Sequence, residues 1–469
     1  MCIAAILFSI NIGRPLIDYD EATYAKVVTD TLQAGQVIDL YHFDRPWFEK
    51  PPLYLWTVMG SVSLFGEHEW AFRIPSIIFA VLCCWLVYFI ALEVTGSVLA
   101  AILGFLVLLT SNSFFVFARE VRLDMAVIAA ILAALYFFLR GVRDERFFGL
   151  VLPMVALGFL SKSVIALLAG PIILAYAALY SQWGFLRSRY FWLGAVAAAV
   201  VWAPWHIVET LKYGGSFWDD YIGRQVVARA SSTITGTNDV LGYINMIVPW
   251  YAPWNAIVVF GAPALLVVAW KRGIMNRETL APLLPLATAL GIIVLFSFAQ
   301  THLGPYIMPA FPFFALAVAG LFHVFVRLFP SLTRPLIAAM LLAVIAGAVM
   351  SFYAVSKKEN EATPFVRDEM LLGKAYRVTG QHGIPLYALD WPTVETFNYY
   401  GGTQTRIVDP ATLPENTLKA PFFLAMNSRG VRYLFDEKGV LRYPGLQPVF
   451  RGEFFILFYS AHDLKLSEQ

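Results

Sequence analysis

Several short polar motifs interrupt this largely apolar sequence, and they carry the side chains best suited to chemistry. These residues are Asp20, Glu49, Lys50, Arg122, Asp124, Lys162, His302 and Tyr306. Carboxylates can take a proton from a hydroxyl group, while lysine and arginine can hold a phosphate. Each residue falls in a loop at one end of an apolar run, and the order of the runs puts these loops on one side of a membrane. This placement predicts an enzyme that works at a membrane surface.

The acidic residues also have simpler explanations. Asp20 precedes residues 22–34, whose apolar residues have helical spacing and which end at Gly35, so Asp20 could cap a helix that lies flat in the membrane interface. Asp124 runs directly into an apolar stretch and could cap that helix while it pairs with Arg122. A cap and a catalytic carboxylate are compatible roles, so both interpretations stay open.

The lysines allow two interpretations as well. Lys50 precedes Pro51 and Pro52, which favour an extended Lys50 and stiffen the start of the next helix. Packing explains a charged Glu49-Lys50 pair on such a turn poorly, and the alternative is snorkelling with an exposed salt bridge. Lys162 has no acidic neighbour in sequence, which predicts an anion from elsewhere as its partner, with snorkelling again as the alternative.

The last polar motif before the tail is the run 300–306, which contains His302 and Tyr306. A single histidine or tyrosine at a membrane interface serves more often as an anchor than as a ligand. Both residues nevertheless lie on the same predicted side as the acidic and basic motifs, so they remain candidates for the same site.

The composition indicates that these motifs belong to a membrane protein. Of the 469 residues, 59% are hydrophobic and only 14% are charged, and the mean hydropathy is +0.66. A soluble domain carries about 25% charged residues. The net charge of +2, without clustered lysine and arginine on a polar domain, argues against a nucleic-acid partner. Cys2, Cys83 and Cys84 lie in apolar segments and are interpreted as inert core residues.

About eleven membrane spans are predicted from runs of apolar residues. They cover residues 1–13, 73–94, 97–117, 125–140, 147–161, 163–181, 191–209, 251–270, 280–298, 305–326 and 336–355. The first run is too short to cross a bilayer and lacks the basic start of a signal peptide, so we expect the chain to begin inside a first helix.

Basic loops predict the orientation of these spans. The basic residues occupy alternate loops, at Arg140/Arg143/Arg146, Arg187/Arg189, Lys271/Arg272/Arg277 and Arg327/Arg334. The positive-inside bias makes those loops cytoplasmic. The loops 14–72, 118–124, 161–163, 210–250 and 299–304 are then outside the cytoplasm, as is everything after about residue 356.

The chain changes character near residue 356, which predicts two domains. Residues 1–355 are expected to form the transmembrane catalytic domain, and residues 356–469 a small soluble α/β domain outside the cytoplasm. Strand-like runs at 384–389, 421–426 and 453–459, and a turn at 436–439, support the second domain. It carries no motif to which chemistry can be assigned.

The motifs together show a family resemblance. They are Asp20-Glu21-Ala22-Thr23-Tyr24-Ala25, the run 48–56 (FEKPPLYLW), Phe65-Gly66 with the run 70–76 (WAFRIPS), Arg122 to Asp124, Gly158 to Lys162, Ala203-Pro204-Trp205, Pro249-Trp250 and Tyr306-Ile307-Met308-Pro309. In this order they resemble the polytopic glycosyltransferases of the GT-C fold, especially the bacterial aminoarabinose-to-lipid A transferases and their relatives, the protein O-mannosyltransferases. The Glu-Lys-Pro-Pro-Leu segment is specific, whereas the scattered Pro-Trp pairs are weak.

The resemblance implies transfer of a sugar, with inversion, from a polyprenyl-phosphate carrier to a lipid, glycan or protein acceptor at the outer face of the inner membrane. The phosphate is a good leaving group, so one carboxylate base and cations for the phosphate suffice. By resemblance, Asp20 is the base and Asp124 its partner or alternate, while Glu49 orients the acceptor or a metal. The candidates for the phosphate are Lys50, Arg122, Lys162, His302 and Tyr306.

Two questions stay open at this point. The outer-loop stretch 221–229 keeps arginines but lacks the histidine that often helps relatives bind a metal, so the use of a divalent metal is in doubt. No cofactor is expected to be required for the transfer. A transporter of lipid-linked or small substrates is the main alternative, although charged residues in mid-membrane and repeated halves, which are typical of transporters, are not evident. Another GT-C activity, such as a polysaccharide ligase or an oligosaccharyl transferase, is a further alternative.

Overall fold

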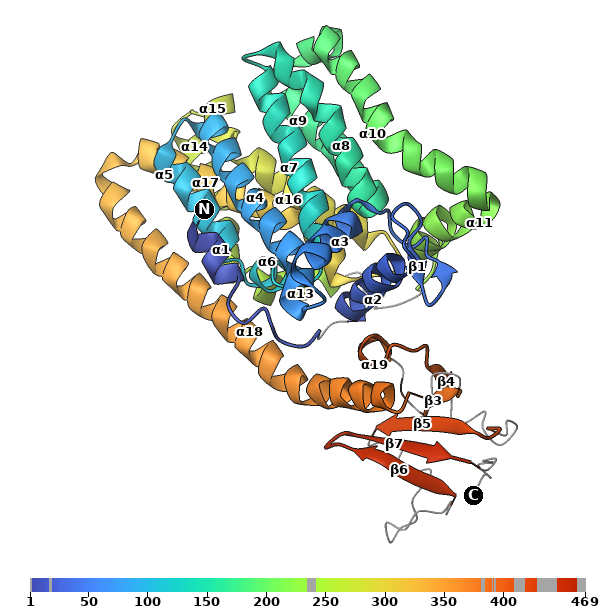
Figure 1. Ribbon diagram of the computed structural model, residues 1–469. Coiled ribbons are helices and arrows are strands. Elements are labelled where there is room, and N and C mark those ends of the chain that lie inside the picture. The colour runs from blue at the N-terminus through green and yellow to red at the C-terminus, as the bar shows by residue number, and fades with distance from the viewer. Residues whose placement is uncertain are drawn as a thin grey trace.

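A computed structural model describes residues 2–16, 19–233, 242–380, 384–389, 391, 394–408, 418–427 and 445–461. The helical part comes first along the chain, and a small sheet follows it (Figure 1). The main helices are α1 (Cys2–Phe8), α2 (Tyr19–Gln33), α3 (Leu53–Phe65), α4 (Glu69–Thr95), α5 (Val98–Leu109), α6 (Asn112–Phe117), α7 (Leu123–Gly141), α8 (Phe148–Lys162), α9 (Ala169–Tyr180), α10 (Arg189–Tyr213), α11 (Gly215–Trp218), α12 (Arg229–Ser231), α13 (Gly242–Trp250), α14 (Trp254–Lys271), α15 (Arg277–Leu280), α16 (Leu283–Ser297), α17 (Ala310–Leu328), α18 (Thr333–Val378) and α19 (Glu395–Gly401).

Seven segments among the described residues are long and apolar enough to cross a membrane. Three further apolar helices, α3, α5 and α16, are shorter, with 10 to 17 residues each. The predicted count of about eleven spans is therefore not confirmed, although the polytopic character is. The predicted spans 147–161 and 163–181 correspond to α8 and α9, which form one long apolar segment interrupted at Ser163, a residue with φ of 53°, and by the 3-10 turn η2 (Ser163–Leu168).

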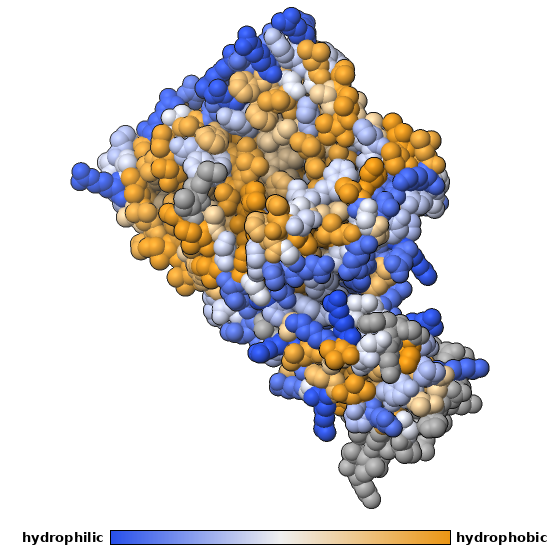
Figure 2. All heavy atoms as spheres, in the orientation of Figure 1, coloured by the Kyte–Doolittle hydropathy of each residue, from blue (hydrophilic) through white to orange (hydrophobic). Residues whose placement is uncertain are grey.

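The surface of the helical part has the pattern expected of a membrane protein. Apolar residues cover most of the face shown in Figure 2, and hydrophilic residues gather at its upper edge and at the junction with the sheet. Helices α10, α14 and α18 lie on the periphery, and few residues in their apolar windows are buried inside the protein, whereas most of those in α7 and α17 are buried. Hence α7 and α17 form the centre of the bundle, and the peripheral helices face lipid.

The short helix α2 starts at Tyr19, just before the predicted range, and ends two residues before Gly35, whose φ is 63°. Asp20 therefore lies in the first turn and not at the predicted cap position. Every residue from Glu21 to Thr31 is buried, so α2 is enclosed by other parts of the protein, and its position flat in the membrane interface stays a prediction. Its neighbours are α3 on one side and α19 of the C-terminal region on the other (Figure 1).

The C-terminal region contains the predicted small α/β unit. A five-stranded sheet has the order β4-β3-β5-β7-β6, with strands β3 (Leu386–Leu389), β4 (Arg406–Val408), β5 (Phe422–Asn427), β6 (Leu446–Arg451) and β7 (Phe455–Ser460). Strand β3 is parallel to β4 and β5, and β7 is antiparallel to β5 and β6. The three predicted strand runs are thus confirmed as β3, β5 and β7, while the predicted turn at 436–439 lies outside the described residues.

Helix α18 joins the two parts of the molecule. It runs without a break from Thr333 to Val378, along the outside of the bundle and onto the sheet (Figure 1). The predicted boundary between residues 355 and 356 falls inside this helix, so the division into two domains stays a prediction. Near its end, Asp368 accepts hydrogen bonds from the amides of Phe454 and Phe455, at 2.7 and 2.9 Å, and this contact fixes the helix to the sheet.

Candidate active site

The first candidate residue, Asp20, forms an ion pair that joins the start of α2 to the start of α7. Its Oδ2 accepts a hydrogen bond from Nη1 of Arg122 at 2.7 Å. The Asp20 side chain is 38% exposed, whereas the Arg122 side chain is 5% exposed. A buried arginine thus presents a partly open carboxylate at the start of α2, which is the geometry a general base needs to reach a substrate.

Arg122 is itself held by a second carboxylate. Its Nε donates to Oε2 of Glu120 at 3.2 Å, and the other oxygen of Glu120 accepts from Nζ of Lys358 in α18. The Glu120 side chain is 1% exposed. An alternating chain of charges therefore links α18 to the Asp20 carboxylate through Glu120 and Arg122.

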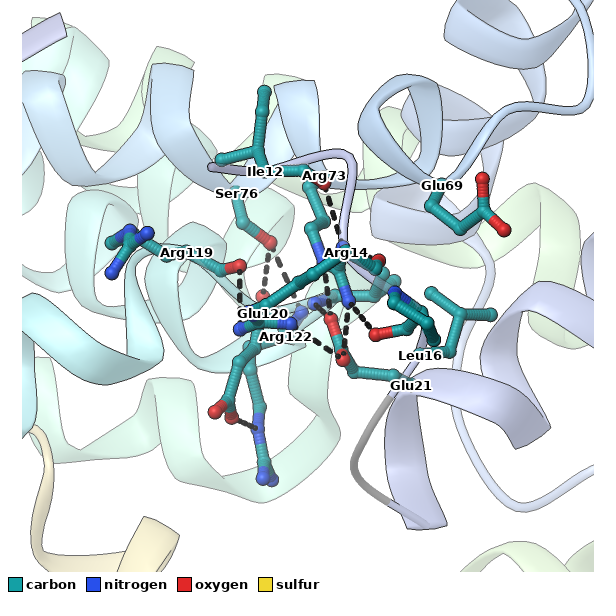
Figure 3. A network of polar contacts seen from close by, with 12 residues as sticks. Ile12, Arg14, Leu16, Glu21, Glu69, Arg73, Ser76, Arg119, Glu120 and Arg122 are labelled. Carbon is teal, nitrogen blue, oxygen red and sulfur yellow. Dashed lines mark hydrogen bonds and ion pairs between the residues drawn. The ribbon is translucent and has the colours of Figure 1, made fainter. Parts of the chain in front are cut away.

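The residue next to Asp20 has a contrasting environment (Figure 3). The carboxylate of Glu21 is fully buried and accepts two hydrogen bonds of 2.8 Å from Arg73. It also accepts from the Val121 amide at 2.9 Å and contacts Arg14 at 3.5 Å. Burial alone would raise the pKa of Glu21, but Arg73, then Arg14 and the Val121 amide, hold that pKa well below its usual range. The Glu21 carboxylate is thus stabilised in its charged form and fully enclosed by protein groups.

Asp124 and Lys162 form another ion pair, between the first turn of α7 and the last turn of α8. Nζ of Lys162 donates to Oδ1 of Asp124, and the two side chains are 11% and 5% exposed. The expected anionic partner of Lys162 is therefore Asp124. The pairing of Asp124 with Arg122 considered from sequence is wrong, because Arg122 reaches Asp20 and Glu120.

Glu49 and Lys50 both contact the segment after α11, which forms a π-helix, η4 (Asp219–Ala228). Nζ of Lys50 donates to Oε1 of Gln225 at 2.8 Å. Glu49 accepts from Nη2 of Arg224 at 2.6 Å, with side chains 30% and 56% exposed. Helices of this type occur frequently at functional sites. The Glu49-Lys50 turn is thus part of an interaction between loops, which snorkelling alone does not explain.

Several charged groups influence the ammonium group of Lys50. Removal from water lowers its pKa to about 8, Arg229 and Lys162 contribute to the lowering, and Glu49 and Asp20 oppose it. Glu49, Asp20, Lys162 and Arg229 all influence the pKa of Lys50, which is consistent with the ion pairs Asp20–Arg122 and Asp124–Lys162 lying near it. The residues predicted from four separate parts of the sequence, at 20, 49–50, 122–124 and 162, are therefore brought together.

The last two candidates lie at the edge of this cluster. The hydroxyl of Tyr306 accepts from Nη1 of Arg229 at 2.9 Å, which brings the turn η5 (Gly304–Ile307) to the cluster. The amide of Thr301 donates to the carbonyl of Arg229 at 3.1 Å, so the two segments run side by side. His302 is 2% exposed, and its ring lies 4.9 Å from that of Tyr243. The structure thus places Tyr306 on a cation and packs His302 against Tyr243.

A resident metal does not fit the described residues. Among them, no group of three or more histidine, cysteine, aspartate or glutamate side chains is placed to hold a metal ion. Glu49, the residue considered for a metal, faces the guanidinium of Arg224 instead.

Several residues of the site were not predicted from sequence. Glu120, Lys358 and Gln225 were not singled out, and Glu21 and Arg73 were noted only as parts of motifs. One sequence feature could have identified Glu120 as a site residue, because Glu120 lies in the charged run 119–124 between apolar segments. Lys358 lay beyond the predicted boundary at 355, and its approach to the site depends on the uninterrupted course of α18.

Comparisons with known proteins agree with this architecture. Residues 49–207 match the family model described as dolichyl-phosphate-mannose-protein mannosyltransferase. The undecaprenyl phosphate-alpha-4-amino-4-deoxy-L-arabinose arabinosyl transferase of Erwinia tasmaniensis is 27% identical over 314 residues, which are 65% of this chain and 55% of the relative. One such transferase of Proteus mirabilis is 28% identical over 260 residues, 53% of this chain and 46% of the relative. The chain thus spans about half the length of the curated relatives it matches.

Two solved structures share the fold. ArnT from Cupriavidus metallidurans, crystallised with undecaprenyl phosphate, matches with a TM-score of 0.75 at 18% identity, over 100% of this chain and 98% of that chain. The archaeal oligosaccharyltransferase AglB from Archaeoglobus fulgidus, in complex with an inhibitory peptide and a dolichol-phosphate, matches with a TM-score of 0.60 at 12% identity, over 94% of this chain and 73% of that chain. The predicted resemblance is confirmed: this chain is a polytopic membrane protein with the GT-C fold, similar in sequence to aminoarabinose transferases and protein mannosyltransferases.

Proposed function

We propose that this protein is an inverting membrane glycosyltransferase that moves a sugar from a polyprenyl-phosphate carrier to an acceptor hydroxyl outside the cytoplasm. The observation that carries the proposal is the convergence of one partly open carboxylate, Asp20, with the cations Lys50, Lys162 and Arg229 at one end of the bundle. A base beside a cluster of cations matches the requirements of transfer from a lipid phosphate. The similarity to arabinosyl transferases supports the same reaction class over a transporter.

The division of roles follows from exposure and pairing. Asp20 takes the proton of the acceptor hydroxyl as the acceptor oxygen attacks the anomeric carbon of the sugar, and the bond from that carbon to the phosphate oxygen breaks. The electron pair leaves with the carrier phosphate, so no general acid is needed. Lys50, with Arg229 and the Tyr306 hydroxyl beside it, stabilises the charge on the leaving phosphate.

The remaining candidates support this arrangement. Arg122 is engaged with Asp20, so it orients the base more directly than it binds phosphate. Lys162 is neutralised by Asp124 and contributes less to phosphate binding than Lys50. Glu49 positions the acceptor together with Arg224, and buried His302 packs against Tyr243 near the 304–307 turn. Asp124 is the alternate base if Asp20 does not act.

The mass of cell-envelope products tests the activity. Lipid A, glycans and secreted proteins are compared by intact-mass analysis in cells that carry the wild-type chain, Asp20→Asn or no chain. We expect a product heavier by one sugar only with the wild-type chain, because Asn cannot accept the proton and transfer falls by on the order of 10²-fold or more. Equal amounts of the heavier product with Asp20→Asn would move the role of base to Asp124, and unchanged masses without the chain would contradict the proposal.

The orientation is part of the same proposal. The basic loops predict that the end of the bundle carrying Asp20 faces away from the cytoplasm. A reporter that is active only outside the cytoplasm should work when fused after Gly380, beyond the end of α18, and fail when fused after Arg272. The opposite pattern would place the site in the cytoplasm, where a carrier-linked donor is not required.

A further inference from the structure

A second candidate site lies at the end of the bundle opposite to Asp20. A cavity of about 490 Å³ is enclosed by the ends of α4, α9 and α17 together with α15 and the start of α16. Arg327, which lines it, is 21 residues after Tyr306 of the candidate active site. At a rise of 1.5 Å per residue this separation is roughly 30 Å, about the thickness of the hydrocarbon core. The cavity and the active site therefore face opposite leaflets.

The interior of this cavity suits a hydrocarbon chain. Its inner wall carries Ile90, Ala91, Val94, Leu316 and Val324. Cavities of 300 to 1,000 Å³ with a mostly apolar lining and a few polar groups are typical ligand sites.

One buried polar group in the wall has no partner. Tyr176 lines the cavity and is 1% exposed, and no described residue forms a hydrogen bond with its hydroxyl group. Buried hydroxyl groups are normally paired, because an unpaired one costs about 1 to 3 kcal/mol. A ligand oxygen in the cavity would supply the missing partner.

The mouth of the cavity is cationic. Arg327 pairs with Glu278 at 2.9 Å, and both side chains are well exposed. The guanidinium of Arg277 lies over the ring of Tyr180 at 4.9 Å, and among the described residues no carboxylate is within ion-pair distance of it. Arg277 and Arg327 together carry two positive charges, and Glu278 carries one negative charge, so the mouth of the cavity has an excess positive charge. Basic pockets between membrane helices on the cytoplasmic side bind the head groups of anionic lipids.

From these observations we infer that the cavity binds an anionic phospholipid of the leaflet opposite to the active site. Its phosphate pairs with Arg277 and Arg327 at the mouth, and one acyl chain enters between the ends of α4 and α17. The Tyr176 hydroxyl donates a hydrogen bond to an oxygen of the glycerol ester region. Such a lipid would tie α9, α15 and α17 together at an end of the bundle far from the chemistry.

Binding of defined lipids to the purified full chain tests this inference. Native mass spectrometry in neutral detergent would follow titration with phosphatidylglycerol, phosphatidylcholine or inorganic phosphate. We expect preferential retention of phosphatidylglycerol and at least a tenfold loss of affinity in Arg277→Gln/Arg327→Gln. The matched control is Arg187→Gln/Arg189→Gln, which removes the same charge from the loop after α9 without touching the cavity, and it should bind as the wild-type chain does.

Two further variants probe the interior. Tyr176→Phe should weaken phosphatidylglycerol binding by a few fold, and Ala281→Trp, which fills the mouth, should abolish it although both arginines remain. Equal affinity for both lipids, equal loss in the control variant, or full binding by Ala281→Trp would overturn the inference. An affinity for inorganic phosphate as high as that for phosphatidylglycerol would also overturn the inference, because the site would then bind an anion without requiring a lipid.

Discussion

Asp20 and Glu21 are adjacent in sequence, yet their carboxylates belong to two different kinds of polar region. The cluster around Glu21 is closed: Arg73, Arg14 and a backbone amide enclose a side chain that is not exposed to solvent. The cluster around Asp20 is open: its carboxylate is 38% exposed and is held from one side by Arg122. Two neighbouring acids of similar chemistry are thus suited to different tasks, one to hold loops together and the other to meet a substrate.

The difference shows how a membrane protein can hold charged loops in place while one carboxylate stays partly exposed. Arg73 also donates to the carbonyls of Ile12, Arg14 and Pro15, at 2.6, 2.5 and 3.0 Å (Figure 3). These bonds fix the segment that leads into α2. The closed cluster therefore positions the helix from which Asp20 projects, and the open cluster depends on it.

The largest expected effect comes from opening the closed cluster. Glu21→Gln leaves Arg73 buried without its counter-charge and should reduce the free energy of unfolding by about 3 to 5 kcal/mol. Thermal unfolding of the purified chain measures this loss. Asp20→Asn serves as the matched control, and it should change stability by less than about 1 kcal/mol because Asp20 is partly exposed. Similar losses in both variants would remove the distinction between the two clusters.

The second effect concerns the cations of the open cluster. Lys50→Ala should weaken binding of a polyprenyl-phosphate donor at least tenfold, about 1.4 kcal/mol, because a charge-assisted contact to the phosphate is lost. Lys162→Ala should weaken it less, since Asp124 already neutralises that lysine. Titration in nanodiscs measures both affinities. Unchanged affinity in both variants would mean that the lysines only anchor helices and that Arg224 or Arg229 holds the phosphate.

The third effect is a dependence on pH. Removal from water lowers the pKa of Lys50 to about 8, so its charge is present below this pH and is lost as the pH rises through it. Donor affinity measured between pH 6.5 and 9.5 should therefore decline above about pH 8. Lys50→Arg should flatten the profile, because a guanidinium stays charged in this range, even if its geometry fits the phosphate less well. A decline that persists in Lys50→Arg would assign the titration to another group.

The smallest effect tests the link between α18 and the open cluster. Lys358→Gln removes the charge that faces Glu120 and so loosens the support of Arg122. We expect the turnover number to fall by a few fold, while donor affinity stays the same, since an ion pair that acts through others is worth about 1 kcal/mol. Steady-state kinetics with donor titration separates the two quantities. A change in donor affinity alone would mean that Lys358 acts on the phosphate side.

The sequence alone determined the class of the protein and most of its candidate site. Apolar runs of membrane length predicted a polytopic helical protein, and strand-like runs after residue 356 predicted a small sheet, because both depend on local composition and periodicity. Asp20, Glu49, Lys50, Arg122, Asp124, Lys162 and Tyr306 could be selected because charged or polar side chains between apolar spans stand out in sequence.

Only the tertiary structure decided how these residues pair. Lys162 meets Asp124 and Arg122 meets Asp20, across separations of 38 and 102 residues, and no local pattern encodes such contacts. The same holds for Glu21, whose burial depends on Arg73 from α4, and for Lys358, whose approach depends on the uninterrupted course of α18. Ion pairs between loops are set by the packing of the helices that carry the loops, and packing is a property of the whole bundle.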